Sequence, residues 1–379
     1  MAYRSEYNGK EVDFAGDLGI IALQSCKKLG EQINESILRI RKKRGIPSPE
    51  TFLIDFDEIR FSNGEGKIIL NESVRGKDVY LICDIGNYSC TYSLYGHDNR
   101  MGPDDHYQDI KRALSAMGGK ADRVNVIMPM LYASRQDRRK GRESLDCSMT
   151  LRELEQMGVK TLLTFDVHNS SVQNAVSLMA FENIYATFEI VRSFFEDEPE
   201  VMTKRDNFLI ISPDVGGMER AVYYSTVMKT DVGMFYKRRD FSRVESGRNP
   251  IVQHEYLGRD VAGKNVIIID DMIATGESMI EIVRELKERN AAKVFIATTF
   301  AMFTKGDALF NQLYEEGLLT RLYTTNLTYI PDEITNKPWL KHIDMSPFAA
   351  EVIDSLNTNS SIEPVMNATM RIKSVFNHM

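Results

Sequence analysis

Two adjacent carboxylates directly follow a run of branched apolar residues in the second half of the chain. Residues 266–269 (Val-Ile-Ile-Ile) predict a buried strand that ends at Asp270 and Asp271. Residues 274–278 (Ala-Thr-Gly-Glu-Ser) predict a turn, and helical periodicity begins at Met279. A helix N-terminus with free backbone N–H groups attracts an anion such as a phosphate monoester. The hydroxyls of the turn would add donors to the same anion.

The acidic pair narrows the ligand further. Two carboxylates beside a bound phosphate repel it, unless they face hydroxyl groups or a cation. The vicinal diol of a sugar can donate hydrogen bonds to both carboxylates. The segment therefore favours a sugar phosphate. The alternative is structural: Asp271 would cap the turn, and Gly276 would serve the bend.

A second pair of polar side chains, Asp166 and His168, lies at the end of the predicted strand 161–167. Alternate residues of a strand point to the same side, so both could face one ligand. A magnesium-bound triphosphate could use Asp166 as an oxygen ligand and His168 as a donor. Taken alone, a strand-end Asp-x-His is more often a hydrogen-bonded structural pair.

Three clusters of basic residues occur. Residues 39–44 follow an amphipathic pattern over about residues 18–40 and end at Gly45, which predicts the solvated, cation-rich last turn of a helix. Residues 135–142 and 237–243 differ, because each follows a short apolar segment. Loops that follow strands bind ligands in α/β proteins.

The elements that must position these residues alternate between strands and helices. Alternation of this kind predicts parallel sheets covered by helices, the α/β class. A composition break near residues 181–186 divides the chain into two domains, 1–183 and 184–379. Residues 87–108, rich in tyrosine, glycine and charge, predict a long loop. The predicted strands are residues 79–83, 124–130, 161–167, 208–212, 266–269 and 294–298.

Composition excludes several classes of function. The 379 residues carry a formal net charge of −7, which argues against nucleic acid as the main partner. No apolar run is long enough for a membrane helix, and the N-terminus lacks a signal-peptide pattern, so a cytoplasmic location without membrane contact is expected. The four cysteines form no CxxC pair and predict reduced, structural thiols rather than a zinc site.

The acidic segment resembles the phosphoribosyl-pyrophosphate-binding motif of type I phosphoribosyltransferase folds. Further segments match a known family in the same order along the chain, namely residues 61–65, 72–80, 132–140, 165–168, 212–221 and 237–239. They make the sequence similar to the ribose-phosphate pyrophosphokinase family from about Phe61 to Asp344. The resemblance implies two phosphoribosyltransferase-like domains, each a mostly parallel sheet flanked by helices.

The resemblance also implies roles for individual residues. Lys237 and Arg239 match the catalytic loop, and His168 is a third catalytic candidate. Asp214, Gly216 and Gly217 match the loop that accommodates pyrophosphate. The residues that match the ATP site are Phe61, Asn63, Glu65, Arg135, Gln136, Asp137 and His168. The ribose 5-phosphate site is matched by Asp270, Asp271, Thr275, Gly276 and Ser278, and the metal site by Asp166, His168 and Asp214.

The implied reaction transfers the pyrophosphoryl group of ATP to the 1-hydroxyl of ribose 5-phosphate, with Mg²⁺ as cofactor. The products are phosphoribosyl pyrophosphate and AMP. The resemblance further implies a homo-oligomer, dimer-based and up to a hexamer, in which a neighbouring subunit contributes the loop of Phe61.

Two positions depart from the family pattern, because Ala274 replaces an acidic residue and Glu277 replaces a glycine. They leave open a non-catalytic regulatory homologue that binds nucleotides. A phosphoribosyltransferase is the other alternative.

Overall fold

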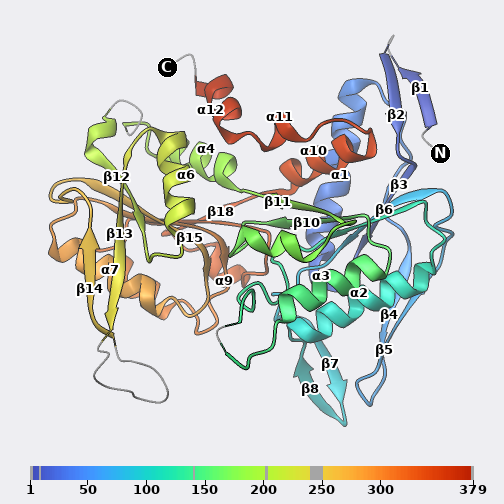
Figure 1. Ribbon diagram of the computed structural model, residues 1–379, viewed down its shortest axis with the longest axis horizontal. Helices are drawn as coiled ribbons and strands as arrows, with labels where there is room; N and C mark the ends of the chain where they lie inside the picture. The colour runs from blue at the N-terminus through green and yellow to red at the C-terminus, as the bar shows by residue number, and fades with distance from the viewer. Residues whose placement is uncertain (1–2, 8–9, 140, 201–203, 240–250, 377–379) are drawn as a thin grey trace. The chain divides into compact units, whose positions relative to one another are not determined.

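The chain folds into an α/β protein with two parallel or mostly parallel sheets (Figure 1). The computed structural model describes all residues except 1–2, 8–9, 140, 201–203, 240–250 and 377–379. Within the described part of the chain, no helix has both the length and the apolar character that crossing a membrane requires. Each of the six predicted strands overlaps a strand of the structure, and the predicted α/β class is confirmed.

Two compact units divide the chain, but the division is not a single cut. Unit 1 comprises Met1–Tyr185, Asn326–Tyr329 and Asp344–Asn367. Unit 2 comprises Ala186–Thr325, Ile330–Ile343 and Ala368–Met379. The first change of unit falls two residues after the sequence-based boundary at 183/184. The structure differs from that boundary in returning two later segments to the N-terminal unit.

Unit 1 contains a five-stranded sheet in the order β11-β10-β9-β6-β3, and all its neighbouring strands are parallel. The inner strands are buried almost throughout, as their branched side chains predict. The strands are β3 (Asp17–Ala22), β6 (Lys77–Ile82), β9 (Arg123–Ile127), β10 (Thr161–Phe165) and β11 (Ala180–Ile184). The helices are η1 (Gln24–Cys26), α1 (Lys27–Arg44), α2 (Pro103–Met117), α3 (Asp146–Gln156), η2 (Ser170–Ala175), α10 (Ser346–Asn357) and α11 (Glu363–Met366).

Unit 2 contains a seven-stranded sheet in the order β14-β13-β12-β15-β16-β17-β18. All neighbours are parallel except the pair β13 and β14. The strands are β12 (Phe208–Ser212), β13 (Asp231–Arg239), β14 (Ile251–Leu257), β15 (Asn265–Ile273), β16 (Val294–Ala301), β17 (Arg321–Thr325) and β18 (Leu340–Ile343). The helices are α4 (Thr187–Asp197), η3 (Arg205–Asn207), α6 (Met218–Met228), α7 (Glu277–Glu288), α8 (Ala308–Glu315), α9 (Asp332–Thr335) and α12 (Ala368–Phe376).

In the part of the chain that the structure describes, three antiparallel hairpins lie outside the two main sheets. They pair β1 (Tyr3–Tyr7) with β2 (Lys10–Phe14), β4 (Phe56–Arg60) with β5 (Gly66–Leu70), and β7 (Thr91–Leu94) with β8 (His97–Arg100). The last hairpin and the start of α2 occupy residues 87–108, so the prediction of a long loop there was wrong. Tyr92 lies in β7, and Tyr95 and Gly96 form the turn between the two strands.

The amphipathic pattern at residues 18–40 also divides differently from the prediction. Residues 17–22 form strand β3, and helix α1 begins only at Lys27. Gly45 ends the helix in the left-handed conformation, with φ 71°, as its position after the basic turn predicts. The first part of the pattern is a strand because its five buried residues in succession need cover on both faces.

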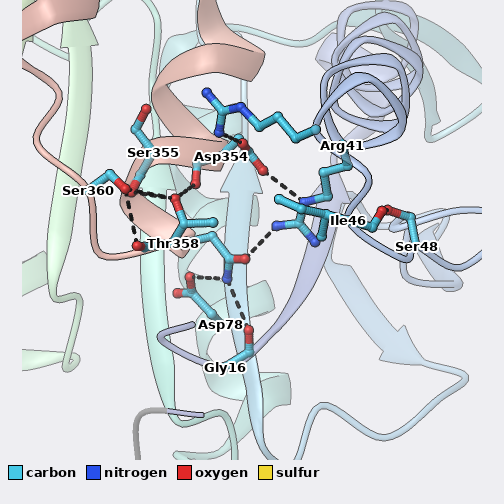
Figure 2. A network of polar contacts seen from close by, with 11 residues as sticks. Gly16, Arg41, Ile46, Ser48, Asp78, Asp354, Ser355, Thr358 and Ser360 are labelled. Carbon is cyan, nitrogen blue, oxygen red and sulfur yellow. Dashed lines mark hydrogen bonds and ion pairs between the residues drawn. The ribbon is translucent and has the colours of Figure 1, made fainter. Parts of the chain in front are cut away.

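Buried polar contacts join helix α10 to helix α1 (Figure 2). Arg41, in the last turn of α1, donates to Asp354 at 2.8 Å and to Asn357 at 2.6 Å. Asn357 donates in turn to Asp78 of β6 at 2.9 Å. Asp354 is fully buried, and Arg41 is 4% exposed. These contacts explain why residues 344–367 belong with the N-terminal half of the chain, and they correct the prediction that the whole basic turn is solvated.

Candidate functional site

The acidic pair lies inside a central strand of unit 2 rather than after it. Strand β15 continues through Asp270 and Asp271 to Ile273, because its last residues still pair with β16. The backbone N–H of Asp271 donates to the Asp270 carboxylate at 2.9 Å. Burial, followed by the neighbouring charge of Asp271, raises the pKa of Asp270 well above its usual range. The two carboxylates therefore share one environment in which a second negative charge is costly.

Arg220 supplies positive charge to this pair, although no role was predicted for this residue from the sequence. It lies in the first turn of α6, and its guanidinium nitrogens are 3.9 Å from Asp270 and 3.8 Å from Asp271. Its side chain is only 9% exposed. The arginine partly offsets the effect of burial on the pKa of Asp270. The signal that could have found it is its place within the segment 212–221, which resembles the family.

The turn after the acidic pair has the shape of an anion site. Gly276 precedes helix α7 with φ 85°, a left-handed conformation that favours glycine. A Cβ atom at this position would lie 2.6 Å from the ring of Phe310. The Thr275 hydroxyl accepts from the backbone N–H of Glu277 at 3.4 Å, and Ser278 is exposed in the first turn of α7. Thr275, Gly276 and Ser278 are thus brought together at a helix N-terminus.

The two departures from the family pattern also have structural partners. Glu277 is exposed and pairs with Lys305 at 2.7 Å, which lowers the pKa of its carboxyl. This pairing offsets the negative charge that Glu277 adds beside the turn. The carbonyl of Ala274 accepts from the backbone N–H of Thr304 at 2.9 Å, so the turn is anchored to the segment that follows β16.

The predicted pyrophosphate loop follows strand β12, the parallel neighbour of β15. Asp214 is exposed, and its carboxylate accepts from the backbone N–H of Gly217 at 3.0 Å. A Cβ atom on Gly217 would lie 2.9 Å from the Ser212 hydroxyl, and one on Gly216 would lie 3.2 Å from Asp214. The glycines therefore allow a tight turn that leads directly into α6. Arg220 follows this loop in α6 and lies 3.9 Å from Asp270 and 3.8 Å from Asp271. The loop and the acidic pair therefore lie at the same edge of the sheet.

Lys237 and Arg239 lie at the end of strand β13. Their backbones pair with His254 and Ile251 of β14, so both residues belong to the strand itself. The side chains of both cations fall outside the described residues, as do residues 240–250. Their assignment as catalytic residues stays a prediction.

In unit 1, two loops meet at the carboxyl ends of the neighbouring parallel strands β9 and β10. Asn169 donates from its side-chain amide to the Asp137 carboxylate at 2.5 Å. This contact joins the loop of Arg135, Gln136 and Asp137 to the segment that carries His168. Arg135 and Gln136 are exposed, whereas the Asp137 side chain is only 5% exposed. Asp137 thus anchors the loop and leaves its neighbours accessible to a ligand.

Asp166 and His168 do not follow the alternation that their spacing suggested. Strand β10 ends at Phe165, and Asp166 adopts a left-handed backbone with φ 44°. Asp166 is 3% exposed, whereas His168 is exposed. The expected shared orientation along a strand was wrong, because neither residue lies in the strand. Both residues still lie at the sheet edge where β9 and β10 end.

The residues predicted to border adenine form the tip of the β4–β5 hairpin. The Phe61 side chain is 47% exposed. The side-chain amide of Asn63 donates to Glu65 at 2.9 Å, and the backbone N–H of Glu65 donates back to Asn63 at 3.2 Å. These contacts give the tip a defined shape. The tip also contacts the β7–β8 hairpin, through a backbone hydrogen bond of 3.1 Å from Tyr95 to Ser62.

A separate pocket of about 510 Å³ lies elsewhere on unit 1. Its lining includes Asp17 and Lys77, the first residues of β3 and β6, together with Phe14, Arg41 and Phe52. The pocket therefore adjoins the amino ends of the strands. The predicted nucleotide loops follow the carboxyl ends of the same parallel sheet.

Comparison with known proteins places these features in a family. Residues 18–158 match the model of the N-terminal domain of ribose phosphate pyrophosphokinase, and residues 180–310 match the phosphoribosyl transferase domain. Ribose-phosphate pyrophosphokinase of Mycoplasma pneumoniae is 30% identical over 312 residues, which cover 80% of this chain and 85% of the relative. The Haemophilus ducreyi protein of the same name is 28% identical over 314 residues, and this match covers 82% of this chain and 90% of the relative.

A solved structure shows the same fold. The crystal structure of phosphoribosylpyrophosphate synthetase from Mycobacterium smegmatis matches with a TM-score of 0.72 at 21% identity. The match covers 91% of this chain and all of that one. The chain belongs to the ribose-phosphate pyrophosphokinase family.

Proposed function

We propose that the protein transfers the pyrophosphoryl group of ATP to the 1-hydroxyl of ribose 5-phosphate. The observation that carries this proposal is the arrangement in unit 2: the Asp270–Asp271 pair, held by Arg220, precedes a left-handed glycine and a helix N-terminus. The carboxylates suit the vicinal diol of a ribose, and the turn suits its 5-phosphate. Membership of the family supplies the reaction.

The chemistry follows from these roles. The sugar's 1-hydroxyl oxygen forms a bond to the β-phosphorus of ATP, while the bond from that phosphorus to the oxygen bridging it to the α-phosphorus breaks. AMP leaves with the bridging oxygen, and the hydroxyl proton passes to the surroundings. Such transfers depend on holding the groups in line and on stabilising the spreading negative charge. We assign Lys237 and Arg239 to that charge and Asp214, Gly216 and Gly217 to the transferred group.

The nucleotide is assigned to unit 1. The exposed Arg135 can stack on the base or clamp phosphates, while Asp137 and Asn169 keep its loop against the end of β10. His168, exposed beside that contact, would donate to a phosphate oxygen. Gln136 is also exposed on this loop and is assigned to the nucleotide with Arg135.

The donor set fits Mg²⁺, the cofactor that the family implies. Among the residues that the structure describes, no group of three or more histidine, cysteine or acidic side chains could hold a metal. Magnesium usually keeps several waters and binds one or two carboxylates together with substrate phosphates. Asp166 in unit 1 and Asp214 in unit 2 are each a hard oxygen ligand of that kind, and a bound ion would neutralise charge on the triphosphate. The nitrogen of His168 suits a phosphate better than magnesium.

We further propose a cytoplasmic homo-oligomer, built from dimers and up to a hexamer, in which each subunit lends the exposed tip of Phe61, Asn63 and Glu65 to a neighbour. The four cysteines are free and buried, which is the state of thiols in a reducing compartment. Light scattering at assay concentration measures the assembly. A monomer that retains full activity would contradict the lending of the tip.

The reaction is tested by AMP release from ATP and Mg²⁺ with and without ribose 5-phosphate. We expect release that requires the sugar and that falls by about a hundredfold or more in the double variant Lys237→Ala, Arg239→Ala, the scale of losing transition-state charge contacts. The double variant Lys204→Ala, Arg205→Ala removes the same charge from exposed positions of unit 2 and should keep full activity. AMP release at the same rate without the sugar would contradict the proposal.

A further inference from the structure

The β7–β8 hairpin of unit 1 contacts a second hairpin of the same unit. In the structure its tip lies beside the tip of the β4–β5 hairpin (Figure 1). The latter tip carries Phe61, Asn63 and Glu65, which our proposed function assigns to the base of ATP.

Three kinds of contact join the two tips. The backbone N–H of Tyr95 donates to the carbonyl of Ser62 at 3.1 Å. Leu94 packs closely on Gly64, since a Cβ atom added to Gly64 would lie 3.0 Å from a methyl group of Leu94. At the base of the β4–β5 tip, the guanidinium of Arg60 lies over the Tyr92 ring at 5.4 Å. A backbone hydrogen bond and an apolar contact thus act on the tip, and a cation–π contact acts on the residue at its base.

The hairpin itself is anchored to the body of unit 1. Its two ends are joined by a 2.9 Å hydrogen bond from the backbone N–H of Met101 to the carbonyl of Cys90. Just before it, the side-chain amide of Asn87 donates to the carbonyl of Ser25 at 2.6 Å. The buried imidazole of His106 lies 2.7 Å from the carbonyl of Asn87. The contacts at the tip can therefore resist movement rather than move with it.

Helix α2 also holds the base of the β4–β5 tip. Arg60 forms an ion pair with Asp109 of α2, which pairs in turn with Arg112 at 2.6 Å. Between the hairpin and α2, the tip is held in one shape while the Phe61 side chain stays 47% exposed. A binding loop that is held in its bound shape loses less entropy when the ligand arrives.

We propose that the β7–β8 hairpin is a brace that pre-organises residues 61–65 for the nucleotide base. Leu94 and Tyr92 are its positioning residues, because they act through Gly64 and Arg60 and not on the nucleotide itself. The brace rests on the proposed function for its ligand, ATP, but its effect on the shape of the tip does not depend on any activity.

The decisive variant removes the hairpin and keeps its base. In this variant, Asn-Gly replaces residues 91–100 and directly joins Cys90 to Met101. The hydrogen bond between Cys90 and Met101 then closes a two-residue turn, a turn that Asn-Gly favours. Leu94→Ser removes only the apolar contact, so it tests the brace even if the deletion prevents folding. Asp98→Ala, at an exposed position on β8, is the matched control.

Two measurements on the full-length chain decide the outcome. Hydrogen exchange of the amides at residues 61–66 should become about tenfold faster in the deletion and faster to a lesser degree in Leu94→Ser, with no change in Asp98→Ala. The KM for ATP should rise about fivefold or more, while the KM for ribose 5-phosphate stays within about twofold.

The outcomes separate the brace from the reaction. Unchanged exchange at residues 61–66 overturns the brace, whatever the activity. Faster exchange with equal rises in both KM values, or with neither, overturns its role in nucleotide positioning. A wild-type protein that forms no AMP refutes the proposed function, and hydrogen exchange still tests the brace.

Discussion

Arg220 determines how much negative charge the acidic pair can carry. Burial and Asp271 raise the pKa of Asp270, and the arginine opposes both effects. A protonated carboxyl offers a weaker acceptor to a ribose hydroxyl, so sugar binding should weaken as the pH falls through this pKa. Arg220→Met removes the opposing charge and raises the pKa further. The acid limb of kcat/KM for ribose 5-phosphate should therefore move to higher pH, with a loss of about tenfold near neutrality, typical of one charge-assisted hydrogen bond.

Two control variants test whether the charge of Arg220 is what moves the acid limb. Arg220→Lys keeps the charge and should leave the acid limb close to its wild-type position. Glu219→Gln changes the charge of the adjacent exposed position in α6 and should leave it unmoved. A uniform fall of activity at every pH in Arg220→Met, without movement of the limb, would mean that the arginine only supports the fold.

The residues of the candidate site differ in how far the sequence could predict them. Asp270, Asp271 and Gly276 form a local pattern, because the strand, the turn and the helix that give them meaning are consecutive. Arg220 acts through carboxylates some fifty positions later, so only the pairing of β12 with β15 brings them together. The exposure of His168 depends on the end of β10 at Phe165, which the apolar sequence through Val167 did not reveal.

At the scale of elements, sequence periodicity located the strands well. It did not predict how far they extend or which neighbouring elements they contact. Strand β12 has the predicted bounds, whereas β15 continues through two carboxylates because β16 pairs with it beyond the apolar run. The β7–β8 hairpin has too few apolar residues for a periodic signal, and its contacts come from the separate β4–β5 hairpin. Neighbouring elements, which no local pattern contains, decided both cases.

The packing of α10 on α1 is the element-scale contact that a single substitution can test. Asp354 is fully buried and accepts from Arg41 at 2.8 Å and from Arg44 at 2.6 Å. Asp354→Ala leaves the buried Arg41 charge without this partner, which typically costs about 3–5 kcal/mol. We expect urea unfolding to show a loss of that size. Lys42→Ala, an exposed position in the same turn, should change stability by about 0.5 kcal/mol or less. Equal effects of the two substitutions would show that the buried pair adds nothing.

At the scale of the whole molecule, the chain passes between the two units five times. The short segment 326–329 returns to unit 1, where Asp84 accepts from the backbone N–H of Tyr329 at 2.9 Å and from the Thr328 hydroxyl at 3.2 Å. The composition break near residues 181–186 predicted a single boundary at 183/184, whereas the first change of unit follows Tyr185. Composition could not reveal the later returns, since their partners in unit 1 lie more than two hundred residues earlier.

These returns predict that residues 1–185 do not form a stable domain alone. Such a fragment lacks α10, so Arg41 loses Asp354 and Asn357, and Asp78 loses its contact with Asn357. We expect that urea unfolding of the fragment, monitored by circular dichroism, will show no cooperative transition. Residues 344–367, attached through a long flexible linker, should restore a cooperative transition because they return the missing helix. The same fusion with those residues in scrambled order controls for the added length. A cooperative transition of the bare fragment would show that the sheet and α1 bury enough surface without α10, and the boundary at 183/184 would then mark an autonomous domain.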